Sequence, residues 1–219
     1  MAEQISLHRF SGKLDNSVGF RGRKNSAFER YYRGPAKGRL LPLSMKKQIA
    51  RMTVLGELSN IFYPVYSLGM GKFAKRRQMA VNNLFVKKNA PAVAVSDSLE
   101  TTITYSNISV AEGHLPAVLF GQANFSTPQT VKVAFSSAEG IVGASGKDDV
   151  FVAVFCPTDN GIILSTPVKR SERELSVAIP DAWNGLRVEV WGFAVGGDAN
   201  NRNFGESSPS AFLGEGTIN

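Results

Sequence analysis

Few residues of this sequence have the types and spacing that catalysis or metal binding requires. The two histidines, His8 and His114, lie far apart in the chain, and Cys156 is the single cysteine. A metal site needs several converging ligands, and these three residues show no ligand spacing. Cys156 ends an apolar run, 150–156, so we expect a buried thiol rather than an activated nucleophile. The sequence therefore predicts no catalytic residue, no metal and no cofactor, and it favours a protein that is not an enzyme.

Two further motifs have simple structural interpretations. The stretch Gly-Met-Gly-Lys at 69–72 lacks the spacing of a phosphate-binding loop, and Phe73 stands where a metal-binding hydroxyl would be needed. We predict a turn between two helices there. The acids Asp148, Asp149 and Asp198 lack the alternating pattern of a calcium loop, so we predict that they are turn residues.

The strongest functional signal is a basic segment interleaved with aromatic residues, within residues 1–42, which we call the arm. Cationic side chains neutralise phosphates and release counterions, while aromatic faces stack on unpaired bases. Because no sequence-reading motif is present, we expect any nucleic-acid binding to have low sequence specificity. Two alternatives stay open: the arm inserts into a neighbouring subunit, or it is an ordinary solvated surface. The candidate nucleic-acid-binding residues are Arg21, Arg23, Lys24, Arg30, Tyr31, Tyr32, Arg33, Lys37 and Arg39.

The charge is distributed very unevenly along the chain. Residues 1–90 carry 18 Lys and Arg against four acids, a net of +14. Residues 91–219 carry seven Lys and Arg against 14 acids, a net of −7, so the chain as a whole has a net charge of +7. This asymmetry favours a polyanionic partner for the first part, or head-to-tail contacts between copies of the chain.

The elements that would position these residues begin with the arm, where we expect either a short hairpin around Lys24-Asn25 or an extended segment. A helical hairpin is expected over 43–90. Its first helix, 44–62, follows from apolar residues at three- and four-residue steps, among them Ile49 and Met52. Pro64 is expected to stop or kink this helix, and 72–88 to form the second one.

From Ala90-Pro91 onward the pattern changes to short runs rich in β-branched and aromatic residues. Such runs, separated by Gly, Pro, Asn and Asp, are typical of an antiparallel β-sandwich of immunoglobulin-like size. We therefore predict an α+β protein whose domain 91–219 folds alone. The expected strands are 101–110, 118–125, 130–136, 150–156, 161–165, 174–179 and 186–195.

The N-terminal residues and the hydropathy of the chain suggest where in the cell the protein is made. The first twelve residues lack the apolar core of a signal peptide, and no stretch approaches the ~20 apolar residues of a membrane span. We expect synthesis in the cytoplasm and no membrane partner.

Several segments resemble an uncharacterised family of Bacteroidetes proteins of about 200–220 residues. They are spread over nearly the whole chain: 11–19 and the basic-aromatic segments as far as Arg33, then 47–52, 80–84 and 205–209. Members of that family have no assigned activity, so the resemblance implies no catalytic or binding residue here.

The charge polarity suggests a function. A basic arm can face packaged nucleic acid while an acidic β domain faces solvent or neighbouring subunits. We therefore predict a homo-oligomeric virion assembly protein, a bacteriophage capsid or head-associated subunit. The alternative is a cytoplasmic nucleic-acid-binding protein of low sequence specificity, and less favoured is an immunoglobulin-like surface adhesion module.

Overall fold

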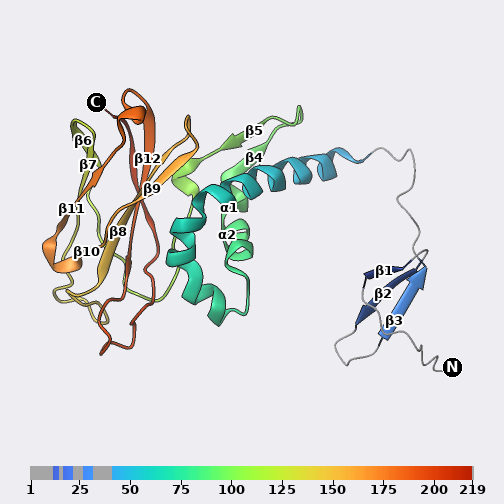
Figure 1. Ribbon diagram of the computed structural model, residues 1–219, viewed down its shortest axis with the longest axis horizontal. Helices are drawn as coiled ribbons and strands as arrows, with labels where there is room; N and C mark the ends of the chain where they lie inside the picture. The colour runs from blue at the N-terminus through green and yellow to red at the C-terminus, as the bar shows by residue number, and fades with distance from the viewer. Residues whose placement is uncertain (1–11, 15–16, 22–26, 32–40, 219) are drawn as a thin grey trace. The chain divides into compact units, whose positions relative to one another are not determined.

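The chain forms two compact units, Met1–Pro42, which is the arm, and Leu43–Asn219, which we call the body (Figure 1). The structure is a computed structural model that describes residues 12–14, 17–21, 27–31 and 41–218, with the backbone alone described in the first three segments. The boundary expected at Ala90-Pro91 does not separate compact units, because the helices and the sheets share one of the two cores described below.

The described part of the arm is a three-stranded antiparallel sheet in the order β1-β2-β3. Its strands are β1 (Gly12–Leu14), β2 (Ser17–Arg21) and β3 (Ala27–Tyr31). The pairing of β2 with β3 agrees with the hairpin expected in this region.

The body opens with two helices, α1 (Leu43–Arg76) and α2 (Val81–Asn89). The predicted helix boundaries are wrong, because α1 continues through Pro64 and through the glycines of 69–72. Proline removes one backbone donor and kinks a helix, and α1 bends near its middle (Figure 1). Burial on both sides of the proline, at Phe62 and Val65, keeps the helix continuous across the bend.

Gly69 serves helix packing rather than a turn. A Cβ at this position would lie 2.6 Å from the carbonyl oxygen of Val110. The backbone N–H of Glu112 donates to the Gly69 carbonyl at 2.9 Å. Glycine at 69 therefore lets an extended segment cross α1 in close contact.

The β part consists of two larger antiparallel sheets and one small hairpin. The larger sheet has the order β10-β8-β12-β13, with β9 also paired to β8, and the second has the order β11-β7-β6. Strands β4 (Val93–Val95) and β5 (Thr101–Ile103) pair only with each other. The other strands are β6 (Asn124–Thr127), β7 (Thr130–Ala134), β8 (Asp149–Cys156), β9 (Gly161–Leu164), β10 (Val168–Lys169), β11 (Glu174–Ala178), β12 (Arg187–Val195) and β13 (Ala211–Thr217). Short 3₁₀ helices span Ala90–Ala92, Tyr105–Asn107, Arg170–Glu172 and Asp181–Trp183.

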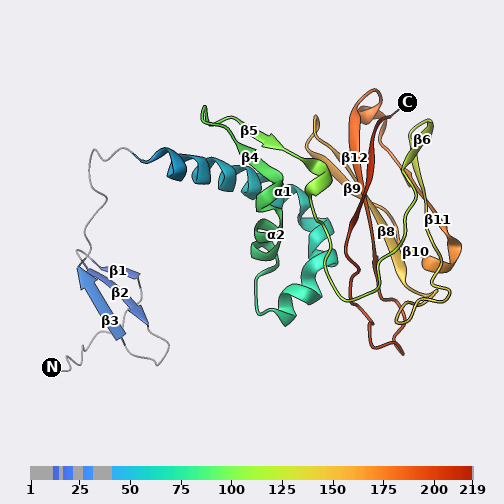
Figure 2. The same ribbon diagram turned by 180° about the vertical axis from the view of Figure 1, so that it is seen from behind.

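The five-stranded sheet is buried on both faces. The helices lie along one face and the three-stranded sheet along the other (Figures 1 and 2). On β12, Val188 and Val190 face the core between the sheets, whereas Trp191 and Phe193 belong to the core shared with the helices. Phe62 of α1 lies in this second core, with ring-centroid distances of 4.9 Å to Phe155 and 5.5 Å to Trp191.

Several strand predictions differ from the structure. The run 101–110 is a strand only at Thr101–Ile103, and 118–125 contributes one isolated bridge, at Phe120, before β6 begins at Asn124. Strand β13 has no counterpart among the predicted strands, because Gly214 and Gly216 interrupt its hydrophobic pattern. The α+β class and the antiparallel sheets are confirmed.

The shared core leads to a prediction about truncation. Removing residues 1–90 would expose the helix-facing side chains of the larger sheet, including Phe155, Trp191 and Phe193, which are at most 1% exposed in the body. We therefore expect the fragment 91–219 to aggregate or to bind a hydrophobic dye, and the fragment 43–219 to melt cooperatively. Expression of both fragments with thermal unfolding would check this. A soluble fragment 91–219 with a cooperative melt would show that the sheets close their own core.

Candidate nucleic-acid interface and charged sites

The predicted nucleic-acid-binding residues lie partly within the described arm strands. Arg21 is the last residue of β2, and Arg30 and Tyr31 lie in β3. The register pairs Arg21 with Ala27 and Val18 with Arg30, so the two arginines lie on adjacent strands. Arg23, Lys24, Tyr32, Arg33, Lys37 and Arg39 lie outside the described residues.

Of the nine Lys and Arg residues within 43–90, four form ion pairs with acids of the body. Lys47 forms an ion pair with Asp97, and Lys88 forms one with Glu112 at 2.9 Å. The guanidinium of Arg77 lies 5.0 Å from the centroid of the Phe73 ring. Side chains already paired with carboxylates have less charge to offer a polyanion, so these four cations are weaker candidates for phosphate contact than the other five.

The strongest of these pairings holds the last turn of α1 to the loop 196–210. The carboxylate of Glu206 is 2% exposed, and its Oε1 lies 2.5 Å from Arg76 Nη2 and 3.4 Å from Lys72 Nζ. Lys72 also donates to the carbonyl oxygen of Phe204. The lysine of the Gly-Met-Gly-Lys stretch therefore has a structural partner, which sequence reasoning missed because Glu206 is 134 residues away.

The two compact units of the chain differ in net charge. Residues 43–219 carry 16 Lys and Arg against 15 acids, a net of +1, whereas residues 1–42 carry nine against three, a net of +6. The unbalanced positive charge of the chain is therefore concentrated in the arm. Residues 43–90 alone keep a net charge of +8, which the net charge of −7 over residues 91–219 offsets in the sum.

A second buried ion pair lies under the loops at one end of the sheets. Asp148 and Arg170 are almost completely buried, with Oδ2 of Asp148 4.0 Å from Nη1 of Arg170. Arg170 also donates to the carbonyl oxygens of Pro116 at 3.4 Å and of Ala117 at 3.1 Å. Burial raises the pKa of Asp148 and lowers that of Arg170. The pair ties three loops together, so Asp148 does more than the turn role predicted for it.

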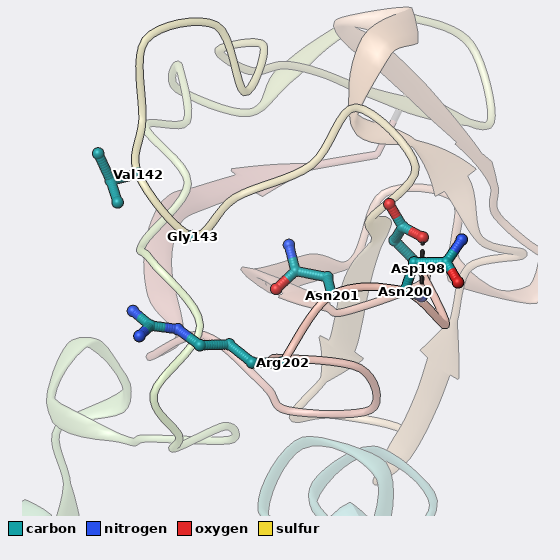
Figure 3. A pocket seen from close by; sticks show the side chains of 6 residues that line it. All are labelled: Val142, Gly143, Asp198, Asn200, Asn201 and Arg202. Atoms are coloured by element: carbon teal, nitrogen blue, oxygen red, sulfur yellow. Dashed lines mark hydrogen bonds between the residues drawn. The ribbon is translucent and has the colours of Figure 1, made fainter.

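These loops also border an open hollow lined by Val142, Gly143, Asp198, Asn200, Asn201 and Arg202 (Figure 3). Asp198 accepts from the backbone N–H of Asn200 at 3.1 Å and from Ser145 Oγ at 3.4 Å. The Asn201 amide oxygen accepts from the backbone N–H of Asn203 at 3.0 Å. The contacts with the backbone of Asn200 and Asn203 lie within one loop, as the predicted turn role of Asp198 requires, whereas the contact with Ser145 joins this loop to a second one. The six described residues that line the hollow include no nucleophile paired with a base.

Glu189 is a buried carboxylate on the helix-facing side of β12. Its Oε1 accepts from Arg187 at 3.0 Å (Nε) and 2.8 Å (Nη2), while its Oε2 has no hydrogen-bond partner within residues 41–218. Burial raises the pKa of Glu189, and the neighbouring Arg187 only partly opposes it. Because the folded state then holds this proton more readily than the unfolded state, this group adds stability as the pH falls from its raised pKa toward 4.5.

The structure describes the single cysteine and one of the two histidines. Cys156 is a buried free thiol, which confirms that prediction. His114 lies against Phe73, with ring centroids 5.7 Å apart, and His8 is outside the described residues. Within the described part of the chain, no three His, Cys, Asp or Glu side chains are grouped so that they could hold a metal. No helix found there has both the length and the apolar character of a membrane span.

Comparison of the chain with protein-family models, with curated proteins and with solved structures gives no match. The resemblance to the Bacteroidetes family therefore stays a prediction.

The Glu206 contacts lead to a prediction about stability. Changing Arg76 to Gln removes the closest cation from a buried carboxylate, and breaking such a pair is costly. Because Arg76 itself is half exposed, we expect a loss of about 2 kcal/mol rather than the larger cost of a fully buried pair. The measurement is chemical denaturation of the full chain.

The matched control is Lys75→Gln, which removes one exposed charge from the same turn of α1. We expect this change to alter the free energy of unfolding by less than ~0.5 kcal/mol. Equal effects of the two substitutions would mean that the contact with Glu206 contributes nothing to stability.

Proposed function

We propose that this protein is a non-enzymatic virion assembly protein, a bacteriophage capsid or head-associated subunit, whose arm contacts nucleic acid or neighbouring subunits. The observation that carries the proposal is the concentration of a net charge of +6 in a compact unit separate from an almost neutral body. A basic segment of this kind can neutralise phosphates while the body packs against other copies.

The size of the arm supports an assembly function. Its described strands have only three to five residues each, and short strands need a hydrophobic partner surface for stability. Contact with other molecules would supply that surface. We also propose that the two facing sheets of the body form an immunoglobulin-like sandwich, since both are antiparallel and enclose a common core.

Assembly is tested first by particle size. We expect the full chain to form large, regular and salt-dependent assemblies at micromolar concentration, because charged contacts between copies are screened by salt. Light scattering and negative-stain microscopy at low and high salt would measure this. A monodisperse monomer of 23.7 kDa under every condition, with nucleic acid included, would exclude the capsid proposal and favour a cytoplasmic nucleic-acid-binding protein.

Nucleic-acid binding is tested by its salt dependence. If the arm neutralises ~5–7 phosphates, log affinity should fall with log salt with a slope of about −4 to −6. Changing Arg21, Arg23, Arg30 and Arg33 together to Ser should make the slope shallower by about three units and weaken binding to all sequences similarly.

The control is the double change Lys75→Ser and Lys87→Ser, which removes two helix cations for which no ion pair is found within residues 41–218. This variant should keep the slope of the unmodified protein. If the slope became shallower in the control but stayed unchanged in the arm variant, the interface would lie on the helices rather than on the arm.

A further inference from the structure

The first three turns of α1 carry an apolar stripe that the body leaves uncovered. Met45, Ile49 and Met52 are 49%, 51% and 44% exposed, whereas Leu55 and Phe62, further along the helix, are completely buried. Gly56 continues the stripe, and a Cβ added there would meet no atom within 4 Å. The spacing 45, 49, 52, 56 alternates steps of four and three residues, which is the pattern of a coiled-coil seam.

The cations next to the stripe divide into two groups. The Lys47 side chain pairs with Asp97, and Arg51 Nε donates to the carbonyl oxygen of Val93 at 3.0 Å, so both reach toward the β4–β5 hairpin. That hairpin lies along the first half of α1 (Figures 1 and 2). Lys46 is exposed and makes no ion pair found in the body. Of the three cations next to the stripe, only Lys46 therefore has no partner within residues 41–218.

The same helix carries a single acid, Glu57, which is also exposed. Lys46 and Glu57 are separated by about three turns, so they lie on the same side of α1. In an antiparallel pair of identical helices, this separation places Lys46 of one chain near Glu57 of the other, and the contact occurs twice. Opposite charges at both ends of one seam favour a second copy of the same helix as the occupant.

We propose that the stripe formed by Met45, Ile49, Met52 and Gly56 binds the same stripe of a second copy in a two-fold antiparallel helix pair. Ile49 of one chain then faces Met52 of the other, and Met45 faces Gly56, whose missing side chain leaves room for the methionine. Flexible methionine side chains adapt to such a seam. The contact uses none of the arm residues and does not depend on nucleic acid.

Cysteine cross-linking in the full chain tests the pairing and its direction. The variants Ile49→Cys and Met52→Cys, one carrying a mass tag, are mixed and oxidised, and the unmodified protein serves as the background because Cys156 is buried. We expect the mixed disulfide dimer to form several-fold faster than either homodimer. Homodimers in excess would mean a parallel pair, and yields no higher than those of Leu119→Cys, an exposed site outside the seam, would overturn the proposal.

Charge reversal tests the complementarity. Lys46→Glu and Glu57→Lys should each reduce the cross-linking rate by about tenfold, since each places like charges together at both ends of the seam. The double variant should restore the rate, whereas Lys75→Glu, at the other end of α1, should leave it unchanged. Single reversals without effect, or a double variant as slow as the singles, would overturn the proposal.

A background with Arg21, Arg23, Arg30 and Arg33 changed to Ser separates this contact from the proposed virion function. The mixed disulfide should form at the same rate in that background, even where nucleic-acid binding and large assemblies are lost. A rate that falls together with assembly would mean that the arm brings the helices together and that the seam does not bind by itself.

Discussion

The packing of α1 on the five-stranded sheet is the contact on which the rest of the body depends. Phe62 is completely buried between Phe155 and Trp191, so the sheet has an apolar layer on the helix side as well as between the sheets. Burial of a large aromatic side chain contributes about 2–3 kcal/mol. This is comparable to the ~3 kcal/mol cost of a proline within a helix, which explains how α1 continues through Pro64.

The same packing determines which charges remain available. Once α1 lies against the sheet, its last turn meets the loop 196–210, and Arg76 and Lys72 reach the buried carboxylate of Glu206. The hairpin of β4 and β5 similarly brings Asp97 to Lys47. Cations that look like one continuous basic segment in the sequence are thus divided between the body, where acids balance them, and the arm, where they stay in excess.

The fold class and most strands could be predicted from the sequence, because they depend on the spacing of apolar residues within each short segment. The sequence did not predict helix ends, buried charges or ion pairs that depend on a residue far away in the chain. The end of α1 was misplaced because Pro64 is a local signal and the core around Phe62 is not. Nothing in the sequence alone marked Glu189 as buried, although Trp191 and Phe193 share its face of β12 and belong to the core beneath the helices. The pair Asp148–Arg170 gave no signal, since its members come from separate loops.

The first part of α1 is left uncovered because it extends beyond the five-stranded sheet, beside the β4–β5 hairpin (Figures 1 and 2). Complete burial along the helix begins only at Leu55. A helix that served only to close the core would gain nothing from Met45, Ile49 and Met52 on a projecting turn, because exposed apolar side chains there promote association. Their regular spacing, together with a lysine and a glutamate three turns apart, is what association with a second copy of the same helix would require.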